Sequence, residues 1–513
     1  MKRHLLFLIA AMLFSITTAF AQGGTTGTLT WNIDDGKLTI SGNGAMPDYL
    51  MFGMPWFNYR EMINTVILES GVTSIGDRAF QYHTNLALIS IPNSLESIGE
   101  FAFSACYALT SITIPNSIIS IKYGAFTGSG LTSISIPGSV TSIGNSVFQG
   151  CTNLSSVIIS NGVTYIGDQM FMLCTNLSSI ILPNSLTNIK YSAFSYCTSL
   201  TSIIIPNSVT DIGGWAFENC TSLTSIIIPA SVICIGNGAF NNCTSLTSID
   251  VESENKNYAS ENGVLFNKNK TSLICCPARK TGEYVIPNSV TSIDNSAFSV
   301  CTSLTSITIP NNVIDIGTGA FSSCAGLTSI TIPNNITTIK AGTFELCTNL
   351  SSVTIPSGVK SIEDAAFREC INLTLITNLN PVPVELDQYY HYYLFYGINI
   401  SECTLKVPIG SVEAYKNAAV WKDFNIVGIN VGIETIKVTV NIYPNPTAGE
   451  LRIESGELRV ENVVIYDVFG KIQRIENWKM KNTIDISHLP TGVYFVKIST
   501  EAGEVTRKVV KEW

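Results

Sequence analysis

The chain has 513 residues, of which 45% are hydrophobic and 13% are charged, and its formal net charge is −9. A chain of this length and apolar content exceeds one ordinary domain, so two or more structural regions with buried cores are expected. The acidic balance disfavours nucleic acids and anionic membranes as partners.

The first residues have the pattern of a secretory signal. Lys2 and Arg3 precede an apolar run, and the small residues Ala19 and Ala21 stand before Gln22. Residues 1–21 are therefore predicted to be a signal peptide; the alternative, a membrane anchor, is disfavoured because the run is short. No later stretch reaches the roughly 18 apolar residues of a membrane helix, so no integral membrane segment is predicted.

Phenylalanine recurs every 22 or 23 residues over most of the chain. The repeated residues are Phe80, Phe103, Phe126, Phe148, Phe171, Phe194, Phe217 and Phe240, followed after a gap by Phe298, Phe321, Phe344 and Phe367. This period predicts a solenoid of about twelve coils plus one variant coil in the gap. A unit of 23 residues cannot bury its own apolar face, so each coil must pack on its neighbours.

One coil, residues 198–220, shows how side chains divide between core and surface. The run Ile203, Ile204, Ile205 favours a short strand in which the first and third isoleucines point inward and Ile204 points outward. Pro206 ends the strand because it cannot donate a hydrogen bond. The strands of successive coils are predicted to stack as a parallel sheet on one face.

The repeat resembles the leucine-rich repeat of the BspA-like family of bacterial surface antigens. The resemblance rests on the unit C-x-x-L-x-x-I-x-I-P-x-x-V-x-x-I-x-x-x-A-F, and Cys-Thr-Ser-Leu-Thr-Ser-Ile recurs at positions 197, 220, 243 and 301. It covers about residues 66–376. By the same resemblance, residues 250–286 form a hairpin-bearing variant coil with Phe266 in its core. Residues 22–65 and 377–432 are then the N-terminal and C-terminal caps.

After a linker at residues 433–441 the repeat disappears. Short alternating runs within residues 442–513 predict a small antiparallel β-sandwich. The motifs YPNPT, VVIYDVFGK, IDISHLPTGVYFVKI and TRKVVK resemble the C-terminal sorting domain of proteins exported by the type IX (Por) secretion system of Bacteroidetes. The resemblance implies contact with that secretion machinery, passage through the outer membrane, removal of this domain and attachment of the rest to the cell surface. The alternative is an ordinary binding sandwich that stays attached.

The sequence predicts no enzyme. After the signal peptide the histidines are His83, His391 and His488, which lie in three separate regions, so a catalytic His-containing arrangement is disfavoured. His83 occupies a position that cysteine takes in later coils, which favours a buried residue. No phosphate-binding loop, cofactor motif or metal-ligand spacing appears, so no cofactor and no metal are expected.

Ten cysteines share one coil position, three residues after the repeated phenylalanine. They are Cys106, Cys151, Cys174, Cys197, Cys220, Cys243, Cys301, Cys324, Cys347 and Cys370. Neighbouring coils bring such residues close enough for disulfides. Because Ser129 fills the same position, a column of buried free thiols is the preferred interpretation.

Two groups of residues are candidate partner-binding sites. Ile158, Ile181, Ile204 and Ile227 occupy the outward position of four consecutive coils, which favours an apolar contact surface, although isoleucines there could also simply favour strand formation. Tyr389, Tyr390, Tyr392 and Tyr393 begin an aromatic run that suits sugar or peptide contacts, or that could pack on the last coil.

These patterns together predict a secreted, cell-surface repeat protein that binds extracellular or host proteins, such as matrix proteins or glycoproteins, as a scaffold or adhesin. The word adhesin comes from the family resemblance, because the residues alone support only an extended binding surface. The alternatives are a structural surface-layer component and a polysaccharide receptor. The sheet face lacks a ladder of aromatic residues, which disfavours the polysaccharide receptor.

Overall fold

A computed structural model describes residues 22–386, 391–430, 441–454, 460–477, 483–500 and 503–513. The predicted signal peptide, Tyr389, Tyr390 and most of the predicted linker lie outside these residues. Contacts divide the chain into two compact units, Met1–Gly428 and Ile429–Trp513. The first unit is a solenoid and the second a small β domain.

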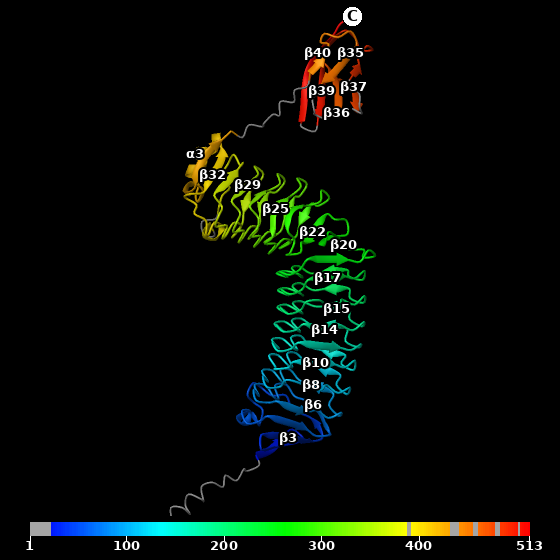
Figure 1. Ribbon diagram of the computed structural model, residues 1–513, viewed down its shortest axis with the longest axis vertical. Coiled ribbons are helices and arrows are strands. Elements are labelled where there is room, and N and C mark those ends of the chain that lie inside the picture. The colour runs from blue at the N-terminus through cyan, green and yellow to red at the C-terminus, as the bar shows by residue number, and fades with distance from the viewer. Residues whose placement is uncertain (1–21, 387–390, 431–440, 455–459, 478–482, 501–502) are drawn as a thin grey trace, which may run out of the picture. The chain divides into compact units, whose positions relative to one another are not determined.

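The first unit is a parallel β-solenoid of about 16 turns, which confirms the predicted fold class (Figure 1). Most ordinary coils have a strand on the sheet face and a shorter strand after the next turn. The sheet-face strands are β5 (Thr65–Leu68), β7 (Leu88–Ser90), β10 (Ser133–Ile136), β12 (Ser156–Ile159), β14 (Ser179–Ile181), β17 (Ser225–Ile228), β19 (Ser248–Val251), β23 (Gly282–Val285), β25 (Leu304–Thr308), β27 (Ser329–Thr331), β29 (Ser352–Ile355) and β31 (Leu375–Asn378).

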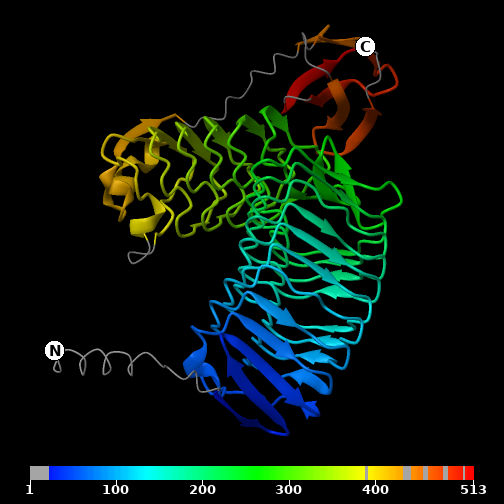
Figure 2. The ribbon, with the colours of Figure 1, turned by 60° about the horizontal axis from the view of Figure 1, so that its bottom comes forward.

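The shorter strands form ladders of their own, such as Asn188 beside Asp211 and Ile189 beside Ile212. They are β6 (Val72–Ile75), β8 (Ser97–Ile98), β9 (Ser120–Ile121), β11 (Ser142–Ile143), β13 (Tyr165–Ile166), β15 (Asn188–Ile189), β16 (Asp211–Ile212), β18 (Cys234–Ile235), β24 (Ser292–Ile293), β26 (Asp315–Ile316), β28 (Thr338–Ile339) and β30 (Ser361–Ile362). Figure 2 shows the coils stacked one on the next.

The repeated phenylalanines are fully or almost fully buried and stack on one another. Phe171 and Phe194, for example, have ring centroids 5.4 Å apart and an interplanar angle of 7°. The aromatic column runs beyond the predicted repeat, because Trp56 stacks on Phe80 and Phe395 stacks on Phe367. Stacking of the cap residues in register explains why the solenoid has more turns than the repeated phenylalanines alone predict.

The sheet-face ladder is not continuous. Residues 111–114 and 202–205 have no strand assignment, although Ile203 and Ile205 are buried and Ile204 is exposed as predicted. The expectation that every coil bonds to both neighbours through this sheet is therefore wrong at these two coils. Inward and outward side chains still alternate in these two coils, because the neighbouring turns and the stacked phenylalanines keep the backbone in place. Nothing in the described residues explains why the strands are interrupted.

The variant coil carries the predicted hairpin. β20 (Tyr258–Glu261) pairs antiparallel with β21 (Val264–Asn267), which pairs antiparallel with β22 (Ser272–Cys275). Phe266 is fully buried, as predicted. The buried residues form one cluster up to this hairpin and a second cluster after it. The hairpin thus separates two stacks of coils, which we call the first stack and the second stack.

Both ends of the solenoid are covered. At the start, β1 (Gln22–Thr26), β2 (Leu29–Asp34) and β3 (Lys37–Gly42) form an antiparallel meander, followed by β4 (Gly44–Ala45) and a 3-10 turn at Phe57–Tyr59. At the other end lie α2 (His391–Leu394), β32 (Thr404–Pro408), α3 (Val412–Asn417) and β33 (Asn425–Ile429). Two 3-10 turns, Ile409–Ser411 and Trp421–Asp423, stand before and after α3. β32 ends at Pro408, and α3 follows it after the first 3-10 turn.

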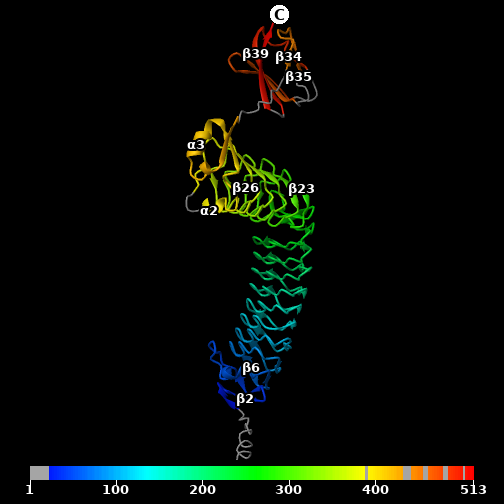
Figure 3. The same ribbon diagram turned by 60° about the vertical axis from the view of Figure 1, so that its left-hand side comes forward.

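The second unit consists of two antiparallel sheets around one buried cluster, as predicted (Figure 3). One sheet contains β34 (Asn441–Tyr443), β35 (Glu450–Glu454) and β38 (Thr483–Asp485). The other contains β37 (Ile472–Asn477), β36 (Val460–Asp467), β39 (Gly492–Thr500) and β40 (Gly503–Lys511).

Candidate functional site

The predicted isoleucine stripe, which comprises Ile158, Ile181, Ile204 and Ile227, lies on the outer face of the sheet. Ile158 pairs with Ile181 in the ladder. The exposed fractions are 45% for Ile158, 57% for Ile181, 85% for Ile204 and 59% for Ile227. The residues beside each of them in the sequence point inward, although residues 202–205 around Ile204 have no strand assignment, so the core does not use these four side chains. The stripe is an apolar surface that faces solvent in the described part of the chain.

The same outward position continues past the stripe with different chemistry. Asp250 stands beside Ile227 in the ladder and ends the stripe with a carboxylate. After the hairpin Val285 stands beside Thr308, and Thr331 stands beside Thr354. Asp250 and Val285 belong to the variant coil, and the repeat pattern alone did not bring them into this column. For Val285 the signal would have been Pro287 two residues later, as Pro206 follows Ile204; Asp250 has no such proline.

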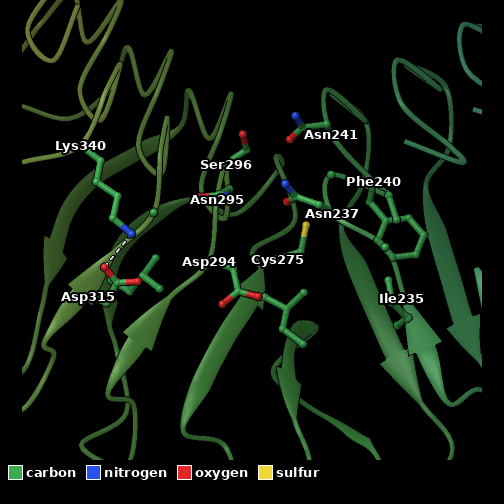
Figure 4. A pocket seen from close by; sticks show the side chains of 16 residues that line it. Ile235, Asn237, Phe240, Asn241, Cys275, Asp294, Asn295, Ser296, Asp315 and Lys340 are labelled. Carbon is green, nitrogen blue, oxygen red and sulfur yellow. Dashed lines mark ion pairs between the residues drawn. The ribbon is translucent and has the colours of Figure 1, made fainter. Parts of the chain in front are cut away.

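A cavity of about 450 Å³ opens where the variant coil interrupts the stack (Figure 4). One wall is the turn at Gly236–Asn241, and the other is the turn at Asp294–Ser296. Ile274 and Cys275 of the variant coil lie between them. Sequence analysis did not predict this cavity.

The variant coil leaves this space because its turn is short. Leu273 pairs with Ile293 in the ladder, and the backbone N–H of Cys276 donates to the carbonyl of Ala297, as the N–H of Phe217 does to that of Ala239. Cys276 therefore takes the place of the repeated phenylalanine. It follows Leu273 by three positions, whereas Phe298 follows Ile293 by five. Two residues of the turn are missing, and the cavity lies at their position.

Charged groups line the side of the cavity formed by the second stack. Lys340 and Asp315 form an ion pair with the Nζ to Oδ1 distance of 2.7 Å. Asp294 accepts a hydrogen bond from the hydroxyl of Ser272. Burial raises the pKa of the Asp294 carboxyl, and the Ser272 hydrogen bond opposes that shift. Apart from the Lys340 and Asp315 pair, Asp294 is the charged group of the lining.

The aromatic run closes the end of the solenoid. Leu394 and Phe395 are buried, and the N–H of Phe367 donates to the carbonyl of Leu394. Tyr389 and Tyr390 lie outside the described residues, as does the side chain of Tyr392. Tyr393 is 48% exposed. The described part of the run therefore packs on the last coil through its apolar members, while Tyr393 faces outward.

The cysteine column consists of buried free thiols, as predicted. Each thiol hydrogen also has an acceptor: Cys220 Sγ donates to the carbonyl of Phe194 at 3.2 Å, and Cys174 Sγ donates to that of Phe148 at 3.1 Å. Burial raises the pKa of Cys220 to about 12. Such thiols remain protonated at neutral pH and are poor nucleophiles.

His83 is fully buried, as predicted, with its ring edge-on to Phe80. Burial lowers its pKa to about 4. Nδ1 lies 3.2 Å from the carbonyl of Gln81. Within the described residues, no group of three or more histidine, cysteine, aspartate or glutamate side chains could hold a metal ion. The helices of the described residues are all too short or too polar to cross a membrane.

A stack of short parallel strands with leucine and isoleucine at fixed inward positions, capped at both ends, defines a leucine-rich repeat solenoid. The chain belongs to the BspA type leucine-rich repeat family, whose model matches in six copies over residues 52–177, 165–277 and 275–384. A second family model, the secretion system C-terminal sorting domain, matches residues 441–512. Both resemblances inferred from the sequence motifs are thereby confirmed. No curated protein matches the chain.

Several solved structures are similar to this chain. A leucine-rich cell surface protein from Faecalibacterium prausnitzii A2-165 has 25% identity and a TM-score of 0.48, over 80% of this chain and 99% of that one. A leucine-rich repeat protein from Bacteroides ovatus has 24% identity and a TM-score of 0.42, over 75% and 99%. Another from Eubacterium ventriosum has 24% identity and a TM-score of 0.35, over 74% and 96%.

Proposed function

We propose that this protein is a non-catalytic, cell-surface leucine-rich repeat protein that binds extracellular proteins through the isoleucine stripe. The observation that carries the proposal is the exposure of four isoleucines in consecutive coils, up to 85% for Ile204. An isolated exposed isoleucine is ordinary, but a contiguous apolar row is a common feature of protein interfaces. The stripe suits the apolar centre of such an interface, with the surrounding hydroxyls as its polar rim.

Export of the protein follows two signals in this proposal. The signal peptide at residues 1–21 carries the chain across the inner membrane, and the sorting domain at residues 442–513 directs it through the type IX machinery to the cell surface. The match of the sorting-domain model to residues 441–512 supports the second step. Deletion of residues 442–513 tests it: the truncated protein should accumulate in the periplasm, and its appearance at the cell surface would contradict the proposal.

The binding role is tested with the purified full chain. Binding to matrix proteins, mucins and glycans is measured for the wild type and for a variant in which Ile158, Ile181, Ile204 and Ile227 are all changed to threonine. Threonine is β-branched and occupies the same column at Thr308, Thr331 and Thr354, so the sheet should tolerate it.

The matched control changes Thr308, Thr331 and Thr354 to serine, which alters the same column outside the stripe. A protein partner should lose affinity at least tenfold for the isoleucine variant and keep its affinity for the control. Equal affinity of both variants for that partner would show that the stripe is not the binding surface. Binding to glycans alone would favour the polysaccharide receptor instead.

A further inference from the structure

The turn after each short strand contains two residues that link neighbouring coils, and we call them the turn pair. Asn145 and Ser146 are one turn pair, and Asp168 and Gln169 form the next. When the first residue of a pair is aspartate or asparagine, its side-chain oxygen accepts the backbone N–H of the first residue in the following pair. This bond joins Asp77 to Glu100 (2.8 Å), Asn145 to Asp168 (3.0 Å), Asp168 to Tyr191 (3.1 Å) and Asn295 to Thr318 (2.8 Å).

A second bond runs through the other member of the turn pair. Its backbone N–H donates to the carbonyl of the first residue in the following pair, as from Ser146 to Asp168 (2.8 Å) and from Trp215 to Asn237 (3.1 Å). The same bond joins Ser296 to Thr318 (2.9 Å) in the second stack. Each such turn pair therefore makes two hydrogen bonds to the next coil: its first side chain accepts a backbone N–H, and its second backbone N–H donates to a carbonyl.

The variant coil lacks its turn pair, and this leaves both neighbours without these bonds. On the first stack, the side-chain oxygen of Asn237 and the backbone N–H of Gly238 have no hydrogen-bond partner among the described residues. On the second stack, the backbone N–H and carbonyl of Asn295 likewise have none there. All four groups belong to residues that line the cavity, and Figure 4 shows Asn237 and Asn295 on its two sides.

We propose that this cavity binds an Asn-Gly turn of a partner protein, which takes the position of the missing turn pair. The partner asparagine would donate its backbone N–H to Asn237 Oδ1 and accept the Gly238 N–H at its carbonyl. Its side-chain oxygen would accept the Asn295 N–H, and the N–H of its glycine would donate to the Asn295 carbonyl. The partner would thus make the four bonds that a turn pair makes in the ordinary coils.

The backbone shape and the charge of the site select the sequence of the partner. The second residue of the turn pair has positive φ throughout, for example 56° at Ser146, Gln169 and Ser296 and 63° at Gly238. Glycine adopts this conformation without a steric penalty, and Asn-Gly is a frequent turn sequence. The carboxylate of Asp294 lines the same cavity, so it disfavours aspartate and favours the neutral asparagine. Asn237 and Asn295 are exposed, so each bond to the partner replaces a bond to water and contributes only a modest net stabilisation; specificity comes from making all four bonds together.

The proposal involves residues other than the isoleucine stripe and does not depend on its role. The probe is a cyclic hairpin peptide with an Asn-Gly turn and a fluorescent label, titrated with the purified full chain and followed by fluorescence anisotropy. Control peptides carry Leu-Gly or Asp-Gly in the turn. The Asn-Gly peptide should bind, and both controls should bind at least tenfold more weakly, because each loses hydrogen bonds or meets the Asp294 charge.

Two matched variants separate binding from folding. Asn237→Ala should weaken the peptide about tenfold or more and leave the unfolding midpoint unchanged, because its side-chain oxygen has no partner in the free protein. Asn145 occupies the same coil position, and its side-chain oxygen accepts the Asp168 N–H in the folded chain. Asn145→Ala removes this bond, so it should lower the unfolding midpoint and leave peptide affinity unchanged. A third variant, with Asn-Gly inserted between Ile274 and Cys275 to restore the turn pair, should not bind the peptide.

The proposal is overturned if the Asn-Gly peptide does not bind. It is equally overturned if the peptide binds the Asn237→Ala or insertion variant as tightly as the wild type. The fourfold isoleucine-to-threonine variant should bind the peptide normally, and loss of binding there would place the peptide on the stripe and contradict the cavity as its site. Failure of the stripe experiment leaves each of these outcomes unchanged, so the two proposals can be judged separately.

Discussion

The first and second stacks have separate cores of the same pattern and differ on the surface. Phe194 in the first stack and Phe321 in the second are fully buried between stacked phenylalanines. At the outward sheet position, however, four consecutive coils of the first stack have isoleucine where three coils of the second have threonine. The inward residues are limited by packing against both neighbours, whereas the outward residue is limited only by its strand. The comparison teaches that the outward column can change without altering the fold.

The largest expected effect tests whether the two cores are equivalent. Phe194→Ala and Phe321→Ala should each lower the free energy of unfolding by about 3–5 kcal/mol, because each leaves a cavity in the middle of a stack. Denaturant unfolding of the two variants measures this. A loss below about 1 kcal/mol in either stack would show that its column is not close-packed.

A second prediction concerns His83, which holds the position of a cysteine in the first stack. Its pKa is about 4 in the folded chain and near 6.5 when unfolded, so the unfolded state binds more protons between these values. Stability should therefore fall as the pH drops from 6.5 to 4, by roughly 3 kcal/mol in total. Unfolding curves at pH 7 and pH 4.5 measure the loss, and His83→Cys should abolish the pH dependence contributed by this position.

A third prediction compares equivalent thiols in the two stacks. Cys220→Ala and Cys347→Ala each remove a buried sulfur and its hydrogen bond to a phenylalanine carbonyl. Each should lower the free energy of unfolding by about 1–2 kcal/mol. Differential scanning calorimetry of the pair checks the value. Unequal losses would mean that the buried thiols contribute differently to the free energy of unfolding in the two stacks.

The smallest expected effect is on the surface. Ile204→Thr should change the free energy of unfolding by less than about 0.5 kcal/mol, because the side chain is 85% exposed. Chemical denaturation with Thr331→Ile as the reciprocal variant measures both directions. A loss above about 1 kcal/mol for Ile204→Thr would indicate that the isoleucines stabilise the ladder, and the comparison between the stacks would then concern folding.

The sequence was sufficient for the repeated core and for the direction of its side chains, but not for the strand ladder at residues 111–114 and 202–205. The spacing of Phe80 to Phe367 predicted the solenoid, and the run at residues 203–205 predicted that Ile204 points outward, because a 23-residue unit has only one way to bury its apolar positions. The cavity could not be found in the same way. It results from two absent residues between Leu273 and Cys276, and a missing residue leaves no motif. Aligning Cys276, rather than Phe266, with the phenylalanine column would have been the signal.

The extent of the solenoid was also underestimated for a physical reason. Trp56 and Phe395 continue the aromatic column, but both lie outside residues 66–376, where the repeat unit could be recognised from its motif. Their positions depend on parallel pairing of β3 with β5 and of β31 with β32, which are contacts between segments with no shared motif. Sequence periodicity detects coils whose sequences are similar, and it misses coils that share only the backbone conformation.

The stacked phenylalanines have a consequence for the gene. Each ring in the first stack from Phe103 to Phe217 meets its neighbours at 5.3–5.5 Å with nearly parallel planes, so neighbouring coils offer one another nearly the same surface. Duplication of one 23-residue segment there would lengthen the protein by about 4.8 Å and would require no new kind of contact. Chain length is therefore a property that this fold can vary in steps of one coil, while both caps and the sorting domain stay the same.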